Sequence, residues 1–423
     1  MYRGKNIFDF SVFFTAILLW ICGIFVIYSA LYIHESGPLA GLHRHQMLWV
    51  GIGITLVLVI VSLPTKFIFK FSYVFYILSI IMLIYVVVSG TTSKGAERWI
   101  GFAGIRIQPS EFAKIGLLLA LAKYFSEKKI SLFEVSSIVF PLILIAIPFI
   151  LVLNQPDLGT AIVFLSFSLP MFFWAGMSIL EIFYLISPVI SVVLSGIPLV
   201  LAFGTSDDLG IAGAIPWGIF FLICCGIFIA TKPPKFILIG GVLINLVAGT
   251  VTNILWNEHL QDYQKERIIS FIDPQSDPYD AGYQLIQSQV AIGSGHILGK
   301  GYLNGTQTRL SYLPEQHTDF IFSVFGEQFG FIGCMTILLV FLFFLLKSLR
   351  ITRDIKNRYT NLLITGAVSI ICFHTFVNIA MITGMMPVTG LPLPFLSYGG
   401  SFTLTVAVLT GFILNARVHD QDF

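Results

Sequence analysis

Long apolar segments, separated by short polar stretches, occupy most of the 423-residue chain. Twelve can be counted, near residues 10–32, 46–63, 69–89, 110–124, 137–153, 158–176, 180–203, 212–231, 235–255, 319–346, 361–385 and 398–416. A helix that crosses a hydrocarbon core of about 30 Å needs roughly 17–25 residues of this kind. The pattern therefore predicts an all-α polytopic membrane protein with about 10–12 transmembrane helices.

The composition agrees with this class. Hydrophobic residues make up 56% of the chain and charged residues only 11%, whereas about a quarter of an average globular chain is charged. The net charge of +2 does not indicate a nucleic-acid partner. All five cysteines lie within apolar segments and lack the paired spacing of metal sites or disulfide frameworks. The first apolar segment is too long for a cleaved signal sequence, so we expect a retained first span.

The basic residues indicate an orientation. With the N-terminus inside, most Lys and Arg residues fall on the inner side, including the cluster "KSLRITRDIKNR" at 347–358. Two longer polar segments, 89–112 and about 256–319, then fall on the outer side. We expect a multi-pass membrane protein with both termini cytoplasmic. We also expect one transmembrane domain over 1–423, with a first outer loop near 90–110 and a large, partly helical extracytoplasmic loop at about 256–319.

The larger outer loop contains several candidate acids. Asp273 and Asp277 each precede a proline, where aspartate commonly starts a turn, and Asp280 follows shortly after. The spacing does not choose among these three. The segment "YQLIQSQVAI" places Leu285 and Gln289 four residues apart, which predicts a short helix.

Ionisable residues also occur at the ends of the apolar segments. Glu111 and Lys114 stand three residues apart, and such residues at membrane depth face either a partner or a cavity. They form either an intrahelical ion pair or part of a site. Asp157 in "NQPDLGT" fits a helix N-cap better than a functional role.

Further polar residues lie near the last three apolar segments. Glu315, His317 and Asp319 lie close together before one of them, which favours hydrogen bonding at a helix end over a metal site. His374 and Asn378 share a helix face and predict a helix–helix contact. The stretch "GLPLPFLSYGGS" (390–401) predicts a proline- and glycine-rich break that opens the last span.

Six stretches in this order give the chain a resemblance to a known family. They are "ERWI", "QPSEFAK", "QPDLGTA", "DPYDAGYQLIQSQVAIGSG", "GKGYLNGTQTRLSYLPEQHTDFIFSVFGEQFG" and "GLPLPFLSYGGS". The chain resembles the SEDS family of bacterial cell-wall polymerases (shape, elongation, division and sporulation) over nearly its full length. The "GTQ" and "GLPLPF" variants look more like the elongation (RodA) branch than the division (FtsW) branch.

The resemblance implies an activity and a set of site residues. It implies a peptidoglycan glycosyltransferase that polymerises lipid II, the undecaprenyl-pyrophosphate-linked disaccharide-pentapeptide, into glycan strands during cell elongation and rod-shape maintenance. Such an enzyme would act at the outer face of the bacterial cytoplasmic membrane. Its essential aspartate corresponds to Asp277, which would act as general base for the acceptor hydroxyl. The implied substrate-binding residues lie in the matched stretches and are Arg98, Trp99, Glu111, Lys114, Asp157, Gln287, Ser288, Lys300, Gln307, Glu315, His317 and Asp319.

The resemblance also implies partners. We expect a class B penicillin-binding protein, as the elongation-type transpeptidase, together with other membrane proteins of the elongation complex. No residue set for a metal stands out, although a divalent cation such as Mg²⁺ or Mn²⁺ could assist at the diphosphate. Family members usually have ten spans, so the three apolar segments within 180–255 predict an added helix pair.

Two other functions are compatible with the pattern. A lipid II flippase would use Glu111, Lys114 and Asp157 as a pathway across the bilayer. A non-catalytic scaffold would recruit the transpeptidase and tolerate single polar substitutions. The concentration of polar groups on one outer face favours the polymerase.

Overall fold

A computed structural model describes residues 8–32, 41–89, 91–93, 96–102, 105–132, 134–201, 210–260, 262–276, 281–310, 312–313 and 315–419. Asp277 and Asp280 lie outside the described residues, as does the side chain of Arg98. Their predicted roles therefore stay predictions from the sequence.

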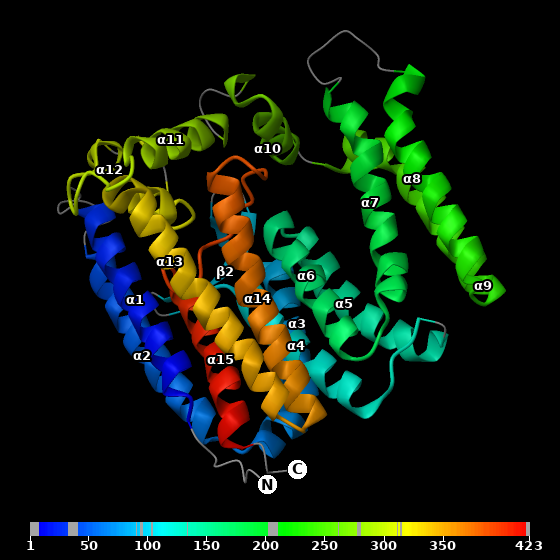
Figure 1. The fold of residues 1–423 in the computed structure, drawn as a ribbon, viewed down its shortest axis with the longest axis horizontal. Coiled ribbons are helices and arrows are strands. Elements are labelled where there is room, and N and C mark those ends of the chain that lie inside the picture. The colour runs from blue at the N-terminus through cyan, green and yellow to red at the C-terminus, as the bar shows by residue number, and fades with distance from the viewer. Residues whose placement is uncertain are drawn as a thin grey trace. The chain divides into compact units, whose positions relative to one another are not determined.

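Helices make up most of the described chain (Figure 1). In chain order they are α1 (Phe10–Leu31), α2 (Leu42–Ser62), α3 (Thr65–Ser89), α4 (Pro109–Glu127), α5 (Val135–Leu153), α6 (Leu158–Trp174), α7 (Ile179–Leu201), α8 (Gly210–Thr231), α9 (Lys235–Ile254), η1 (Leu255–His259), α10 (Asp262–Ile272), η2 (Pro274–Ser276), α11 (Ala281–Ser294), α12 (Thr306–Arg309), α13 (Ile321–Asp354), α14 (Arg358–Ile382) and α15 (Gly400–Val418).

Every predicted apolar segment coincides with a helix, and the all-α membrane fold is confirmed. Ten of the described helices are long and apolar enough to cross a membrane. The two predicted segments that fall outside this set are α4 and α6. Helix α6 has only 17 residues, and α4 carries Glu111, Lys114, Lys123 and Glu127. Both pack against neighbouring helices, so neither depends on an apolar surface toward lipid.

One short stretch of the chain is β-structure. Strands β1 (Thr91–Ser93), β2 (Ala96–Phe102) and β3 (Ile105–Ile107) form a small antiparallel sheet in the order β1-β2-β3. Trp99 pairs with Thr91, and Gly101 pairs with Arg106. The sequence predicted only an outer loop near 90–110, because strands as short as these carry little periodic signal.

The packing divides the chain into two compact units. Unit 1 consists of Met1–Lys129, Val139–Ala175 and Gln284–Phe423, and unit 2 consists of Ile130–Ile138 and Gly176–Tyr283. Both consist mainly of membrane helices, so the prediction of one transmembrane domain stays a prediction.

Three helices form the centre of unit 1. In α14 and α15, 72% and 78% of the apolar span is buried, against 28–39% in α1, α2, α3, α5 and α13. Helix α4 is buried along most of its length between α3, α6 and α14. Helix α15 packs along α2, and α13 packs between α1 and α14. The centre is therefore the place where polar side chains can meet without contacting lipid.

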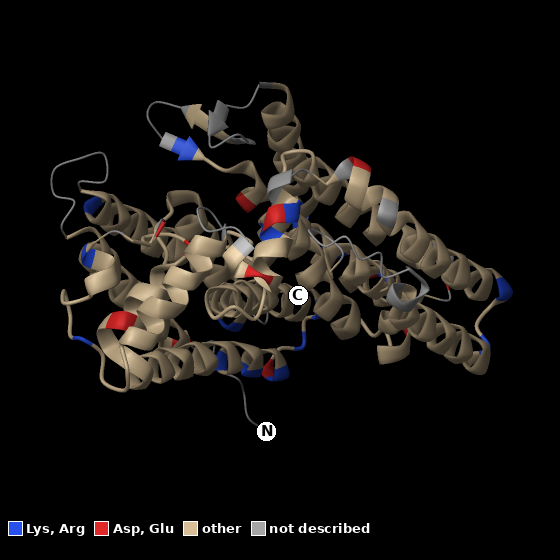
Figure 2. Cartoon of the chain, turned by 90° about the horizontal axis from the view of Figure 1, so that it is seen from above, with Lys and Arg blue, Asp and Glu red and all other residues tan. Residues whose placement is uncertain are grey.

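The two ends of unit 1 differ in charge. At one end Asp9, before α1, pairs with Arg417 in the last turn of α15, and Asp354 at the end of α13 lies 3.8 Å from the same guanidinium. The basic cluster at 347–358 belongs to this end, which we call the basic end. Figure 1 shows α1 beginning and α15 ending side by side, and Figure 2 shows charged residues as isolated patches on a mostly uncharged chain.

An irregular segment, 383–399, links α14 to α15 and runs into the core of unit 1. We call it the re-entrant segment. Phe395 packs against Trp20 of α1 and Phe344 of α13, at centroid distances of 5.3 and 5.1 Å. Helix α15 therefore begins deep in the bundle, where Gly400 lies beside Trp49 of α2. This confirms the predicted break at 390–401.

Unit 2 is held together by a polar seam between α7 and α9. Asn245 of α9 accepts a hydrogen bond from Ser191 (2.8 Å) and donates one to Ser187 (2.9 Å). One turn further, Ser195 donates to Thr252 at 2.7 Å. Side-chain hydrogen bonds of this kind commonly hold membrane helices together. The three helices α7, α8 and α9 occupy the interval in which an added pair was predicted.

The close approach of the re-entrant segment to α1 can be tested with one methyl group. A Cβ at Gly23 would lie 2.5 Å from the Phe395 carbonyl oxygen, whereas a Cβ at Gly51 meets nothing within 4 Å. We expect Gly23→Ala to lower the free energy of unfolding by about 1–3 kcal/mol through overpacking. The matched variant Gly51→Ala should leave the thermal unfolding midpoint in detergent unchanged or slightly higher. Equal thermal unfolding midpoints for the two variants would contradict the close contact between Gly23 and Phe395.

Candidate active site

A buried ion pair lies in the first turns of α4. The Lys114 Nζ donates to Glu111 Oε1 at 2.8 Å, and the two residues are 0% and 3% exposed. The second carboxylate oxygen, Glu111 Oε2, is buried without a hydrogen-bond partner among the described residues. The sequence left open whether Glu111 and Lys114 form an intrahelical ion pair or part of a site, and the ion pair is present. Its burial makes it far more costly to break than a pair at the surface.

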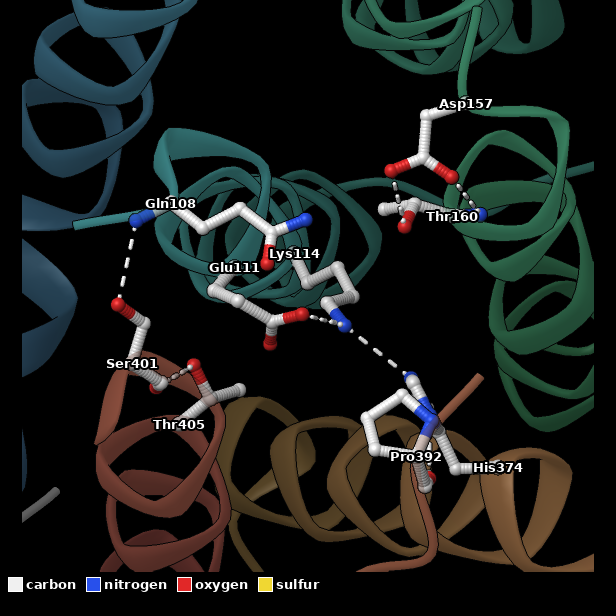
Figure 3. A network of polar contacts seen from close by, with 9 residues as sticks. All are labelled: Gln108, Glu111, Lys114, Asp157, Thr160, His374, Pro392, Ser401 and Thr405. Atoms are coloured by element: carbon white, nitrogen blue, oxygen red, sulfur yellow. Dashed lines mark hydrogen bonds and ion pairs between the residues drawn. The ribbon is translucent and has the colours of Figure 1, made fainter. Parts of the chain in front are cut away.

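His374 of α14 joins this pair (Figure 3). Its Nε2 lies 3.1 Å from Lys114 Nζ, and its Nδ1 lies 3.3 Å from the Pro392 carbonyl oxygen. A carbonyl oxygen only accepts, so Nδ1 carries the proton and donates, and Nε2 accepts from the ammonium. Asn378, one turn later, donates to Leu391 O (2.8 Å) and Asp319 O (2.7 Å).

The predicted helix–helix contact of His374 and Asn378 is thus only partly right. His374 reaches α4 through Lys114, but both side chains also hold the irregular backbone that follows α14. The position of this backbone could not be read from helical spacing.

The network of Glu111, Lys114 and His374 lies inside the bundle, near the end that is opposite the basic end. His374 stands eight residues before Ile382, the last residue of α14, which at 1.5 Å per residue is about 12 Å along the helix. The N-termini of α4 and α15 meet at the same level, where Gln108 N donates to Ser401 Oγ at 3.1 Å. Neither helix has a side-chain N-cap. Two positive helix ends therefore adjoin the pair.

Asp157 is the N-cap of α6, as predicted. Its carboxylate accepts from Thr160 N (3.1 Å) and from Thr160 Oγ1 (3.0 Å), and the residue is buried. Figure 3 shows it in the same region as Glu111 and Lys114. A capping aspartate satisfies N–H groups that have no partner inside the helix.

The re-entrant segment also fixes the stretch 315–320. Tyr398 N donates to His317 O (3.0 Å), and Ser397 Oγ donates to Thr318 O (2.7 Å). The ring of His317 lies 5.8 Å from the ring of Tyr398, centroid to centroid. Glu315, His317 and Asp319 are half-buried and share one short stretch of chain.

A second buried carboxylate, Glu327 of α13, holds the segment 300–309. It accepts from Lys300 Nζ (2.8 Å), Gln307 N (2.9 Å) and the hydroxyl of Thr308 (2.8 Å), with further contacts to Thr306 Oγ1 and Thr308 N. Glu327 is fully buried and Lys300 is 25% exposed. Lys300, predicted to bind substrate, is therefore already paired with a carboxylate.

Helix α11 is present where the helical spacing predicted it, and it is anchored to unit 1. Ser288 Oγ lies 2.7 Å from Ile382 O and 2.9 Å from Ser323 Oγ. Gln287 is half-buried. The side-chain oxygen of Gln307 is buried without a partner among the described residues.

The structure brings some of the predicted residues together. Glu111 and Lys114 form one group, and the backbone of 315–320 is bound to the re-entrant segment, which also contacts His374. Glu327 was not predicted, although it lies in the quoted "FGEQFG" stretch, and His374 was predicted only for a helix–helix contact and not as a residue of the site. Within the described part of the chain, no three His, Cys, Asp or Glu side chains converge as a metal site would require.

Glu327 should control the stability of the 300–309 segment. We expect Glu327→Gln to lower the free energy of unfolding by about 1–3 kcal/mol, because buried donors lose their charged acceptor. Limited proteolysis should then cut faster within 300–309. Asp354→Asn, which alters a long and exposed contact to Arg417, is the control. Proteolysis at an unchanged rate in Glu327→Gln would refute the anchoring role.

The capping role of Asp157 predicts a graded response. Asp157→Ser keeps an N-cap oxygen and should leave the unfolding midpoint near that of the wild type. Asp157→Ala should lose about 1 kcal/mol of stability. Thermal unfolding in detergent measures both, and equal destabilisation by the two variants would argue against a cap.

Comparison with known proteins follows the full length of the chain. The family model for FtsW, RodA and SpoVE, described as "Cell cycle protein", matches residues 9–207 and 197–422. The peptidoglycan glycosyltransferase MrdB of Escherichia coli K12 is 32% identical over 417 residues, covering 98% of this chain and 96% of MrdB. The peptidoglycan glycosyltransferase RodA of Treponema pallidum is 34% identical over 436 residues, covering 98% and 99%.

Two solved structures resemble the fold. A chain from a peptidoglycan synthase complex that coordinates polymerization and crosslinking has a TM-score of 0.68 and 25% identity, with 98% of this chain and 99% of that chain covered. The rod shape determining protein RodA of Thermus thermophilus has a TM-score of 0.60 and 24% identity, with 97% and 96% covered.

Proposed function

Because the chain belongs to the FtsW, RodA and SpoVE family of cell cycle proteins, we propose that it is a peptidoglycan glycosyltransferase. It polymerises lipid II into glycan strands at the outer face of the cytoplasmic membrane during cell elongation. The observation that carries this proposal is the similarity along 98% of the chain to two proteins named peptidoglycan glycosyltransferase. The outer face corresponds to the end of unit 1 opposite the basic end, as the positive-inside rule indicates.

The distribution of buried charge supports chemistry at one face over transport across the bilayer. Among the described residues of unit 1, the buried Asp, Glu, Lys and His are Asp9, Glu111, Lys114, Asp157, Glu327 and His374. Asp9 lies at the basic end, and the others lie toward the opposite end. Beyond Lys114, α4 continues as a buried apolar stretch from Ile115 to Ala122. A flippase pathway would need polar groups along the full depth.

The reaction joins two lipid-linked sugars. An acceptor hydroxyl attacks the anomeric carbon of a second lipid II molecule, the bond from that carbon to the diphosphate breaks, and the diphosphate leaves. Asp277 takes the proton of the hydroxyl, a contribution of roughly 10²–10⁴-fold in rate. A single displacement inverts the anomeric carbon and needs one base, without a covalent intermediate on a second carboxylate.

The substrate-binding candidates divide by exposure. Trp99, Gln287, Lys300, Glu315, His317 and Asp319 are partly exposed, and these side chains contact the sugars or the diphosphate. Gln307, which lies between Lys300 and Glu315 in the sequence, offers a buried side-chain oxygen. Glu111, Lys114, Asp157 and Ser288 are buried, so they hold the site in shape and set its electric field. A fixed ammonium and two positive helix ends stabilise a leaving diphosphate best where water is excluded. Arg98 of β2 stays a substrate-binding candidate from the resemblance alone, because its side chain lies outside the described residues.

Partners follow from the related complex. A relative comes from an assembly that couples polymerization to crosslinking, so we include a class B penicillin-binding protein of the elongation type as partner, with further membrane proteins of the elongation complex. Mg²⁺ or Mn²⁺ enters the proposal only as a counter-ion of the diphosphate, and addition of EDTA to the polymerisation assay tests it.

The central test compares Asp277→Asn with the wild type, using purified lipid II and the cognate transpeptidase. We expect glycan strands from the wild type, at least about 100-fold less from Asp277→Asn, and equal lipid II binding by both. Asp273→Asn is the matched control, because the exposed Asp273 accepts from Gln275 N in a turn.

Each alternative gives a different result in the same assay. Polymer from Asp277→Asn at the wild-type rate would remove Asp277 as the base. Lipid II that crosses liposome membranes while no polymer forms would favour a flippase. A scaffold would show neither activity and would still bind the transpeptidase.

A further inference from the structure

His374 links the buried ion pair of α4 to the irregular backbone that follows α14. Its Nε2 accepts from Lys114 Nζ at 3.1 Å, and its Nδ1 donates to Pro392 O at 3.3 Å. We propose that His374 is a positioning residue for glycan polymerisation, which aligns the Lys114 ammonium and fixes it relative to the re-entrant segment. The inference rests on the proposed function and adds to it a residue outside the predicted site.

The hydrogen bonds require a neutral imidazole. An imidazolium would place a second positive charge 3.1 Å from the Lys114 ammonium, in a region where neither residue is exposed. The facing charged groups are Lys114 and its partner Glu111, both on α4, while α15 contributes the ring of Phe402 at 5.0 Å. A neutral His374 therefore acts as an acceptor that water cannot replace in a closed site.

The ammonium depends on this acceptor for its direction. Lys114 has three N–H groups, and the described residues supply two acceptors, Glu111 Oε1 and His374 Nε2. With both in place, the third N–H has a defined direction, and the charge stays in one position near the N-termini of α4 and α15. Without His374, the ammonium keeps one acceptor and can rotate about its last bonds. Charge that is not preorganised stabilises a transition state less.

The face of α14 that carries His374 also connects the Lys114 ammonium to the stretch 315–320. Asn378 lies one turn after His374 and donates to both Leu391 O and Asp319 O. Pro392 and Leu391 are adjacent, so α14 holds one short piece of the re-entrant segment through two side chains. Together, His374 and Asn378 connect Lys114 on α4 to the backbone that carries Asp319.

The test separates positioning from folding. We expect His374→Leu to lower kcat for lipid II polymerisation by about tenfold or more, as for loss of a hydrogen bond to a charged group, with KM changed less than about twofold. His374→Gln has a side-chain oxygen that can accept from Lys114, and it should recover most of the wild-type kcat. Thr375→Val is the control on the next residue, because among the described residues the Thr375 hydroxyl bonds only back to Ile371 O, at 2.8 Å.

A double-mutant cycle identifies the partner. On a Lys114→Met background, His374→Leu should cost much less in kcat than it costs alone, because the contact is already lost. The same cycle on thermal unfolding midpoints should also be non-additive, which tests the contact without any activity. Additive losses, or a His374→Leu variant with wild-type kcat, overturn the inference. A wild-type protein that makes no glycan overturns the proposed function instead.

Discussion

Backbone inside a membrane protein must have its polar groups hydrogen-bonded within the protein wherever it is not helical. This constraint applies to the re-entrant segment, and much of unit 1 is arranged to meet it. Asn378 and His374 bind its carbonyl groups from α14, and Gln46 of α2 binds Ser397 O and the first turn of α15. Phe395 fills the space between α1 and α13. The segment is therefore a structural core element and not an ordinary loop.

This arrangement determines where charge can be placed. Because the re-entrant segment runs inward, α15 begins deep in the bundle and meets the start of α4 through Ser401 and Gln108. Two helix N-termini are thereby brought below the surface together with the Glu111–Lys114 pair. The same segment binds the carbonyl groups of His317 and Thr318, and Asn378 of α14 binds that of Asp319. One constraint thus connects the buried ion pair with the polar stretch before α13, and these are the two groups that the proposed glycosyltransferase needs close together.

The sequence predicted what depends on local pattern. Apolar segments gave the membrane helices to within four residues, except that α13 ends eight residues later than predicted. The "QPD" stretch indicated the Asp157 cap, and the spacing of Glu111 and Lys114 indicated their pair. The contacts that organise the site were not predictable in this way, because they join residues far apart in the chain. Lys114 and His374 are separated by 260 residues, and the five donors to Glu327 come from a segment with no periodic pattern. The role of Asp277 comes from resemblance alone, since spacing left three aspartates equivalent.

Hydrogen exchange of the wild-type protein in lipid nanodiscs, followed by mass spectrometry, tests the re-entrant segment most directly. The amides of Leu393, Ser397, Tyr398 and Gly399 should exchange as slowly as those of α14 and α15, because each donates a hydrogen bond within unit 1. Exchange of this stretch within seconds, at the rate of exposed loops, would show that it is not packed in the core. The re-entrant segment would then not hold the charges of the site in place.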